Sequence, residues 1–200
     1  MTIAPLKLGF SAKEFAAYCN KIGKVDWRPQ GIVYHNTAMP TLAMVQDYLA
    51  GTNANGKNPK KLRLTPAQLI ENWWQSYINQ GWFGGPHVFI FPKSIYVANP
   101  LTQHGTHSPS FNAFSAANKT KRPYFGIEIV GNYDAEKLPI EMRDLAASTG
   151  ASLLRLAKRE ANSDTVKFHG EDPLTTHKHC PGKNIGTKAQ WVEFVKTKKE

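Results

Sequence analysis

Cysteine and long apolar runs are both scarce in this chain of 200 residues. Cys19 and Cys180 are too few for a disulfide framework, so we expect two reduced thiols. The longest apolar runs are far shorter than the roughly 20 residues that a membrane-spanning helix needs. Residues 1–10 also lack the basic start and the apolar core of a secretory signal. We therefore expect a soluble protein that is synthesised in the cytoplasm without a signal peptide, or one whose signal has been removed.

Internal repeats and low-complexity tracts are absent as well, which excludes solenoids and repeat arrays. Hydrophobic residues make up 41% of the chain and aromatic residues 11%, whereas disordered chains are poorer in both. A chain of this length can bury a full hydrophobic core without disulfides. We expect a single domain over residues 1–200.

Acidic residues are outnumbered by basic ones. The chain has 15 Asp and Glu against 25 Lys and Arg, which gives a formal net charge of +10. Such a charge favours a polyanionic partner, which could be nucleic acid, anionic lipid or bacterial cell wall. Much of the excess lies in residues 57–63 and 183–199, without the interleaved aromatic residues of a nucleic-acid-binding patch. We therefore expect attraction to an anionic envelope surface and no nucleic-acid partner.

Capping patterns and apolar periodicity predict the secondary structure. Ser11 and Glu14 form a capping box before a helix that Gly23 ends, and Thr65 and Gln68 begin the most distinct helix. The predicted helices cover 11–22, 41–50, 65–80, 139–161 and the residues around 191–195. Runs of β-branched and aromatic residues predict strands over 31–35, 86–91, 94–98, 125–131 and 166–168. This mixture favours an α/β (α+β) fold with a single central mixed β-sheet flanked by helices.

Three segments have further consequences for that fold. Gly150 lies inside the predicted helix 139–161 and weakens the prediction of a continuous helix. Residues 52–61 are rich in Gly, Asn and Lys, and we expect them to form an exposed, mobile loop. The loop after the strand 166–168 should lie at one edge of the sheet.

Potential metal ligands gather in residues 166–182, which hold His169, His177, His179 and Cys180. Zinc binds imidazole nitrogen and thiolate sulfur, and a catalytic zinc keeps three protein ligands with an open position for water. This loop can supply two ligands, so a third must come from elsewhere in the chain. The pattern predicts a zinc site that the loop shares with another segment.

Short motifs elsewhere add to this site. His35 ends the run Gly-Ile-Val-Tyr-His, Glu128 lies within Gly-Ile-Glu-Ile-Val-Gly, and Cys180 precedes Pro-Gly. Taken in order with His169, they resemble the zinc-dependent N-acetylmuramoyl-L-alanine amidases. That family includes phage amidase-type lysozymes, bacterial anhydromuropeptide amidases and peptidoglycan recognition proteins. The resemblance covers residues from about 30 to 185 and leaves an insertion at about 52–82 without a counterpart.

The resemblance implies a zinc ion held by His35, His169 and Cys180, with a water molecule as the fourth ligand. His177 and His179 compete as ligands because they lie so close to Cys180. Neighbouring residues of an extended chain point to opposite sides, so His179 and Cys180 should not bind the same ion. We expect His177 and His179 to be substrate-binding residues at the rim of the site.

The resemblance also implies catalytic roles for Glu128 and Lys178. Glu128 would take a proton from the attacking water and pass it to the leaving amine. Lys178 would stabilise the oxyanion of the tetrahedral intermediate. Some members of the family place a catalytic tyrosine where this chain has Pro86, which cannot exchange a proton, and we expect His87 to be a packed residue.

Two more residues ahead of the Glu128 strand match family positions on the wall of the cleft. These are His107 and Asn112, and we expect both to bind substrate. The implied activity is hydrolysis of the bond between the lactyl group of N-acetylmuramic acid and L-alanine in bacterial peptidoglycan. The expected setting is a monomeric phage endolysin that reaches a Gram-negative wall after release or delivery.

Other functions fit parts of the same pattern. A cytosolic amidase that recycles anhydromuropeptides and a delivered antibacterial effector would use the same chemistry. A non-catalytic peptidoglycan-binding protein would share the fold without the reaction. A structural zinc module that binds nucleic acid would need four protein ligands and no exchangeable water.

Overall fold

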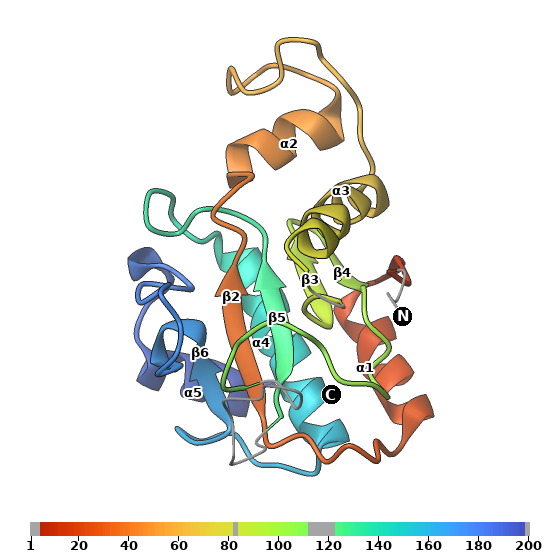
Figure 1. Ribbon diagram of the computed structural model, residues 1–200, viewed down its shortest axis with the longest axis vertical. Coiled ribbons are helices and arrows are strands. Elements are labelled where there is room, and N and C mark those ends of the chain that lie inside the picture. The colour runs from red at the N-terminus through yellow and green to blue at the C-terminus, as the bar shows by residue number, and fades with distance from the viewer. Residues whose placement is uncertain (1–4, 82–83, 112–122, 199–200) are drawn as a thin grey trace.

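The computed structural model describes residues 5–81, 84–111 and 123–198 (Figure 1). These residues form five α-helices and one sheet of six strands. The helices are α1 Ala12–Ile22, α2 Leu42–Ala50, α3 Pro66–Asn79, α4 Ile140–Leu156 and α5 Lys188–Lys196. The strands are β1 Leu8–Phe10, β2 Ile32–Asn36, β3 Val88–Phe91, β4 Ser94–Val97, β5 Phe125–Ile129 and β6 Val166–Phe168. No described helix has the length and apolar character that a bilayer crossing needs.

The sheet is mixed, as the sequence predicts. Its strand order is β1-β4-β3-β5-β2-β6. The neighbours β3–β5, β5–β2 and β2–β6 are parallel, whereas β1–β4 and β4–β3 are antiparallel. Strand β6 therefore lies at one edge, and the loop that follows it begins there, as expected. Strand β1 was not predicted, because three partly exposed residues carry too little pattern to identify a strand.

Local hydrogen bonds explain where the helices begin. The hydroxyl of Ser11 accepts from the N–H of Glu14, whose carboxylate accepts from the N–H of Ser11. Thr65 with Gln68 and Thr187 with Gln190 form the same capping box. The predicted starts of α1 and α3 are correct because each depends on groups only three residues apart, whereas the capping box of α5 was not predicted.

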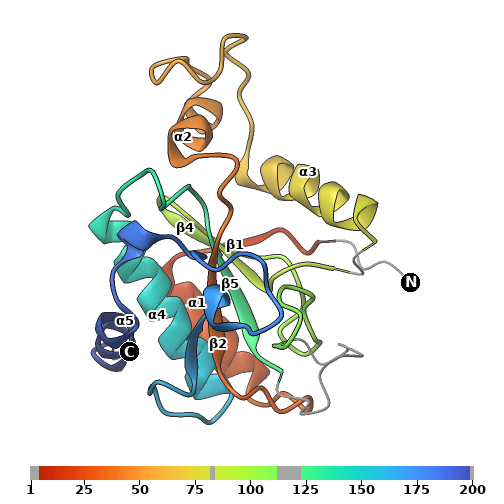
Figure 2. The same cartoon turned by 60° about the vertical axis from the view of Figure 1, so that its left-hand side comes forward.

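Two hydrophobic cores hold the sheet between layers of helices. Helices α1, α4 and α5 cover one face, where they bury Val88 and Ile90 of β3. Helices α2 and α3 pack on the other face, where they bury the alternate residues Phe89 and Phe91. Figure 2 shows α4 and α5 on one side of the sheet and α3 on the other.

Helix α4 is continuous through Gly150 but ends at Leu156, five residues before the predicted end. Gly150 is buried against β2, where a Cβ atom would overlap the hydroxyl of Tyr34 and lie 2.7 Å from Cδ1 of Ile32. The hydroxyl of Tyr34 donates to the carbonyl of Ala146 at 3.1 Å. The glycine therefore allows the helix to approach the strand closely.

Replacing Gly150 with alanine is expected to lower the free energy of unfolding by about 1–3 kcal/mol, because the new methyl group overpacks the contact with Tyr34. Helix propensity alone predicts the opposite, a gain of about 1 kcal/mol. Urea unfolding of Gly150→Ala distinguishes the packing prediction from the propensity prediction. Ser148→Ala, in the same helix, is the control. A more stable Gly150→Ala variant would rule out the packing explanation.

The loop after α2 is more ordered than the sequence suggests. Its side chains are exposed as expected, except Asn58, which is buried. The buried carboxylate of Asp47 accepts hydrogen bonds from the N–H groups of Asn55 at 3.1 Å and Lys57 at 3.0 Å. Figure 1 shows α2 and this loop at one end of the molecule. One buried carboxylate thus holds the exposed loop in place.

Candidate active site

The site begins with two side chains on adjacent parallel strands. The register pairs His35 of β2 with Glu128 of β5, and Glu128 with Phe89 of β3. Paired residues project to the same face of a sheet, so all three lie on the face opposite α4. His35 is the fourth residue of the five in β2, near its carboxyl end, which is where α/β sheets place their ligands.

The loop after β6 brings two further groups to this face. Strand β6 ends at Phe168, and a short 3-10 turn, His169–Glu171, follows directly. The N–H of Gly170 donates to the carbonyl of Cys180 at 2.8 Å. A Cβ atom on Gly170 would lie 3.0 Å from that carbonyl oxygen, so only glycine lets the loop return this closely. The fold-back brings Cys180 to the side of His169.

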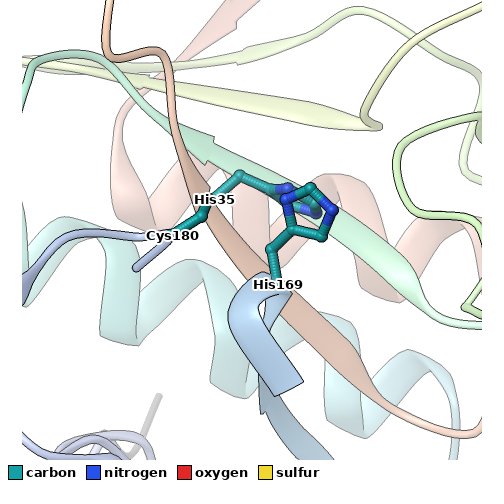
Figure 3. Close-up of side chains that lie close together, drawn as sticks. All are labelled: His35, His169 and Cys180. Atoms are coloured by element: carbon teal, nitrogen blue, oxygen red, sulfur yellow. The ribbon is translucent and has the colours of Figure 1, made fainter. Parts of the chain in front are cut away.

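His35, His169 and Cys180 form a compact cluster (Figure 3). One potential ligand atom from each residue lies within 4.8 Å of the others, and the rings of the two histidines are 4.5 Å apart. Among the described residues this is the only group of three or more such side chains, and His177 and His179 do not belong to it. Two imidazoles and a thiol suit zinc with one position left open. The predicted ligand set therefore fits a zinc ion.

Burial keeps the cluster uncharged in the absence of a cation. It lowers the pKa of His169 to about 4, and burial together with the neighbouring imidazoles lowers the pKa of His35. Burial also raises the pKa of the Cys180 thiol, whose sulfur accepts a hydrogen bond from the N–H of Asn36. Neutral imidazoles are ready to bind a metal, whereas the thiol must release a proton first.

Glu128 is a buried carboxyl group beside this cluster. Its residue is 7% exposed, and burial raises its pKa to about 8. Its charge raises the pKa values of Cys180 and of Tyr77, so both lie within electrostatic reach. A carboxyl group that titrates near neutral pH next to a metal-binding cluster is a strong candidate for acid–base chemistry.

Tyr77 was missed as a site residue. It comes from α3 in the insertion, and the sequence places it only on an apolar helix face. Its ring packs against Gly85, where a Cβ atom would lie 2.8 Å from Cδ2 of Tyr77. No local pattern could show this, since the electrostatic reach of Glu128 to Tyr77 depends on how α3 packs on the sheet.

The predicted His87 and His107 lie below the surface. His87 is packed as expected: its Nε2 is 3.0 Å from the carbonyl of Gln103, and its Nδ1 accepts from the N–H of Gly126. His107 is 4% exposed, and its Nδ1 lies 3.0 Å from Nε2 of His35. Its contact with a potential ligand was not predicted. Asn112, the other predicted groove residue, lies outside the described residues.

The sequence has no match among protein-family models. It has none among curated proteins either. Solved structures do resemble it. The endolysin N-acetylmuramoyl-L-alanine amidase LysCS from Clostridium intestinale URNW matches with a TM-score of 0.54 and 20% identity, over 83% of this chain and 82% of that one. Drosophila PGRP-LB matches with a TM-score of 0.54 and 16% identity, over 81% and 79%. The Staphylococcus aureus hydrolase AmiA matches with a TM-score of 0.50 and 14% identity, over 98% and 92%.

The protein has the amidase/peptidoglycan recognition protein fold. The expected likeness to that group is confirmed at the level of the fold. At identities of 14% to 20%, the likeness extends to architecture and leaves the reaction to be argued from the site.

On this amidase fold, the predicted catalytic Lys178 and the two rim histidines are exposed. The ammonium of Lys178 donates to the carbonyls of Asp172 at 3.0 Å and Pro173 at 3.4 Å. The ring of His177 is 5.7 Å from that of His169. All three therefore lie on the loop that carries His169 and Cys180. Their roles in catalysis and substrate binding stay predictions.

Asp172 is a second residue that sequence reasoning missed. It is fully buried, and its carboxylate accepts from the hydroxyl of Ser108 and from the N–H groups of Ser110 at 2.7 Å and Leu174 at 2.8 Å. These bonds tie the loop of His107 to the loop of His169. The carboxylate thus fixes both loops of the amidase fold around the cluster.

Proposed function

We propose that the protein is a zinc-dependent N-acetylmuramoyl-L-alanine amidase. It would hydrolyse the amide bond between the lactyl group of N-acetylmuramic acid and the L-alanine of the stem peptide in peptidoglycan. The observation that carries this proposal is the cluster of His35, His169 and Cys180 beside the buried Glu128. The fold supports the proposal, because the similar structure LysCS is described as an N-acetylmuramoyl-L-alanine amidase.

His35, His169 and Cys180 would hold the metal. A bound zinc ion lowers the pKa of a coordinated water to about 7 and polarises a carbonyl oxygen. Glu128 would accept the proton from the water that attacks the lactyl carbonyl. It would then donate this proton to the nitrogen of L-alanine as the carbon–nitrogen bond breaks, since an amine leaves only when protonated.

The environment of Glu128 suits both steps. Burial raises its pKa to about 8, and a nearby cation lowers a carboxyl pKa. A value near the working pH lets one group accept and then release a proton. We propose that Lys178 stabilises the oxyanion, and that His177, His179 and Asn112 contact the substrate. His107 was predicted to do so as well.

The proposed substrate is the intact wall, with the protein acting as a monomeric, single-domain endolysin. Its likeness to the endolysin LysCS supports this choice over a soluble muropeptide substrate. Incubation with purified sacculi and, separately, with soluble anhydromuropeptides tests it by mass analysis of the products. We expect stem peptides with a free L-alanine amino terminus and uncut glycan strands. Activity on soluble muropeptides alone would identify a recycling enzyme instead.

A non-catalytic peptidoglycan-binding function is the second candidate. Binding by this fold is illustrated by a point mutant of Drosophila PGRP-LB, which has been solved in complex with tracheal cytotoxin. The complete set of three potential ligands favours an enzyme. Binding of the zinc-loaded protein to sacculi without any release of amino termini would decide for the binding function.

The basic charge is proposed to hold the protein near an anionic bacterial envelope. Lys57, Lys60, Lys61 and Arg63 are all exposed on the loop that Asp47 holds in place. None of the carboxylates in the described part of the chain forms an ion pair with them. Four unpaired cations on an ordered loop favour attraction to negative charge.

Replacing the three loop lysines with glutamine is expected to weaken binding to sacculi at least about tenfold at low ionic strength, since each lysine near an anionic surface contributes about 1 kcal/mol. Salt should remove the difference, because it screens exposed charges. Cosedimentation at two salt concentrations measures the effect. A matched triple variant at Lys21, Lys24 and Lys158 should bind normally, and equal losses in both would show that only net charge matters.

A further inference from the structure

A chain of two hydrogen bonds runs from the backbone to one of the proposed ligands. Nε2 of His107 lies 2.9 Å from the carbonyl oxygen of Tyr124, and Nδ1 of His107 lies 3.0 Å from Nε2 of His35. The two rings meet edge to face, with centroids 5.1 Å apart and planes at 88°. Both histidines are buried, at 4% exposure each.

The partners assign the protons along this chain. A carbonyl oxygen can only accept, so Nε2 of His107 carries a proton and donates it to Tyr124. A neutral imidazole has one protonated nitrogen, so Nδ1 of His107 carries a lone pair and accepts from Nε2–H of His35. His35 is then left with its own lone pair on Nδ1. That nitrogen is the one available to a metal.

The second histidine of the cluster has an equivalent arrangement. Nε2 of His169 lies 2.9 Å from the hydroxyl of Thr175, which is buried. Nε2 of each ring is thus engaged by the protein, and Nδ1 of His169 is also left for the metal when its Nε2 donates to the hydroxyl of Thr175. Metal-binding histidines commonly donate their second N–H to such a partner, which fixes the tautomer and the orientation of the ring.

The fold makes room for His107 and fixes its position. Gly126 lies on β5 two residues before Glu128, and a Cβ atom there would be 2.6 Å from Cγ of His107. The ring therefore occupies the space above a glycine on the face that holds the site. The residue after it, Ser108, donates its hydroxyl to the buried carboxylate of Asp172. His107 is thus fastened to the loop that carries His169.

We propose that His107 is a positioning residue that holds His35 in the tautomer and orientation in which Nδ1 faces the metal. This inference rests on the proposed zinc site but not on any particular substrate. It differs from the predicted contact with substrate, because a buried ring with both nitrogens engaged sets the geometry of a ligand. Partners of this kind change metal affinity by about 10- to 100-fold.

Two substitutions of His107 separate its possible roles. Phenylalanine fills the space but cannot accept a hydrogen bond, whereas asparagine places its Oδ1 near the position of Nδ1 and can still accept from His35. We expect His107→Phe to bind zinc about 10- to 100-fold more weakly in competition with a chelator, and His107→Asn to restore most of the affinity. The matched control is His104→Phe, which removes an imidazole that packs edge-on against Trp27 and should leave zinc affinity unchanged.

Nitrogen-15 NMR of the unaltered, metal-free protein tests the assignment without any variant. We expect the proton of His35 on Nε2 and that of His107 on Nε2. A proton on Nδ1 of His35, unchanged zinc affinity in His107→Phe, or an effect confined to KM would each overturn the inference. Zinc affinity and the tautomer are both read without peptidoglycan. A failure to cleave the wall would therefore count against the proposed function and leave this inference standing.

Discussion

Replacing Cys180 with serine is expected to lower zinc affinity by more than about 100-fold, because it removes a proposed thiolate ligand. This loss exceeds the one expected from removing a residue, such as His107, that only hydrogen-bonds to a ligand. Release of stem peptides should fall in parallel. Serine is nearly isosteric with cysteine and the position is half-buried, so the fold should be retained. Zinc content after dialysis and release of amino termini from sacculi measure the two losses.

Cys19→Ser provides the matched control. Cys19 is the other free cysteine, buried in α1 on the opposite face of the sheet from the cluster. This variant should lose some stability through its buried hydroxyl but keep its zinc and its activity. Retention of zinc and full activity in Cys180→Ser would show that the metal is held elsewhere.

Replacing Glu128 with glutamine is expected to reduce the turnover rate by about 100- to 10,000-fold, because the proposed general base is lost. Zinc binding should remain close to normal, since Glu128 does not belong to the ligand cluster. Measurement of kcat with the zinc-loaded variant and of its zinc content tests both expectations. Activity close to that of the unaltered protein would show that another group handles the proton.

The same substitution should stabilise the metal-free protein in alkaline solution. Burial raises the pKa of Glu128 from 4.5 to about 8, so the folded protein binds more protons than the unfolded one between these values. Stability therefore falls as the pH rises from about 4.5 to 8, and glutamine avoids this loss. Because one unit of pKa corresponds to about 1.4 kcal/mol, the variant should gain a few kcal/mol at pH 8 and almost nothing at pH 4.

Urea unfolding at several pH values checks this prediction. Glu141→Gln is the control, because it makes the same chemical change at an exposed position at the start of α4. Identical pH profiles for Glu128→Gln and the unaltered protein would mean that Glu128 is solvated in solution. A rise in stability together with a loss of activity is expected when a buried charge destabilises the fold but is needed for activity.

Local chemistry made the helices and central strands predictable. A capping box such as Thr65 with Gln68 acts over three residues, so its pattern survives in the sequence. Gly150 weakened the prediction of a continuous helix, because helix propensity was considered without knowledge of Tyr34. Tyr34 packs against Gly150 from a strand far away in the chain. The hydrogen bonds to Asp47 could not be predicted either, since a Gly- and Asn-rich loop has the composition of a mobile segment. Its contact with the buried carboxylate becomes known only from the structure.

The candidate ligand cluster of His35, His169 and Cys180 could be predicted from the sequence for a different reason. His35 lies near the carboxyl end of a buried strand, and Cys180 precedes Pro-Gly, so both have a recognisable residue type in a recognisable setting. The burial of Glu128 and the contact between His107 and His35 follow from the packing of separate segments, which no local pattern records. The neighbours of the reacting groups therefore had to come from the structure.

The most direct test is a zinc titration of the metal-free protein with sacculi as substrate. A zinc amidase should release free amino termini of L-alanine in proportion to added zinc, with saturation at one equivalent per chain. Glu128→Gln should bind the same equivalent and release almost none. Full release by the metal-free protein, or no release by the zinc-loaded protein, would contradict the proposed function.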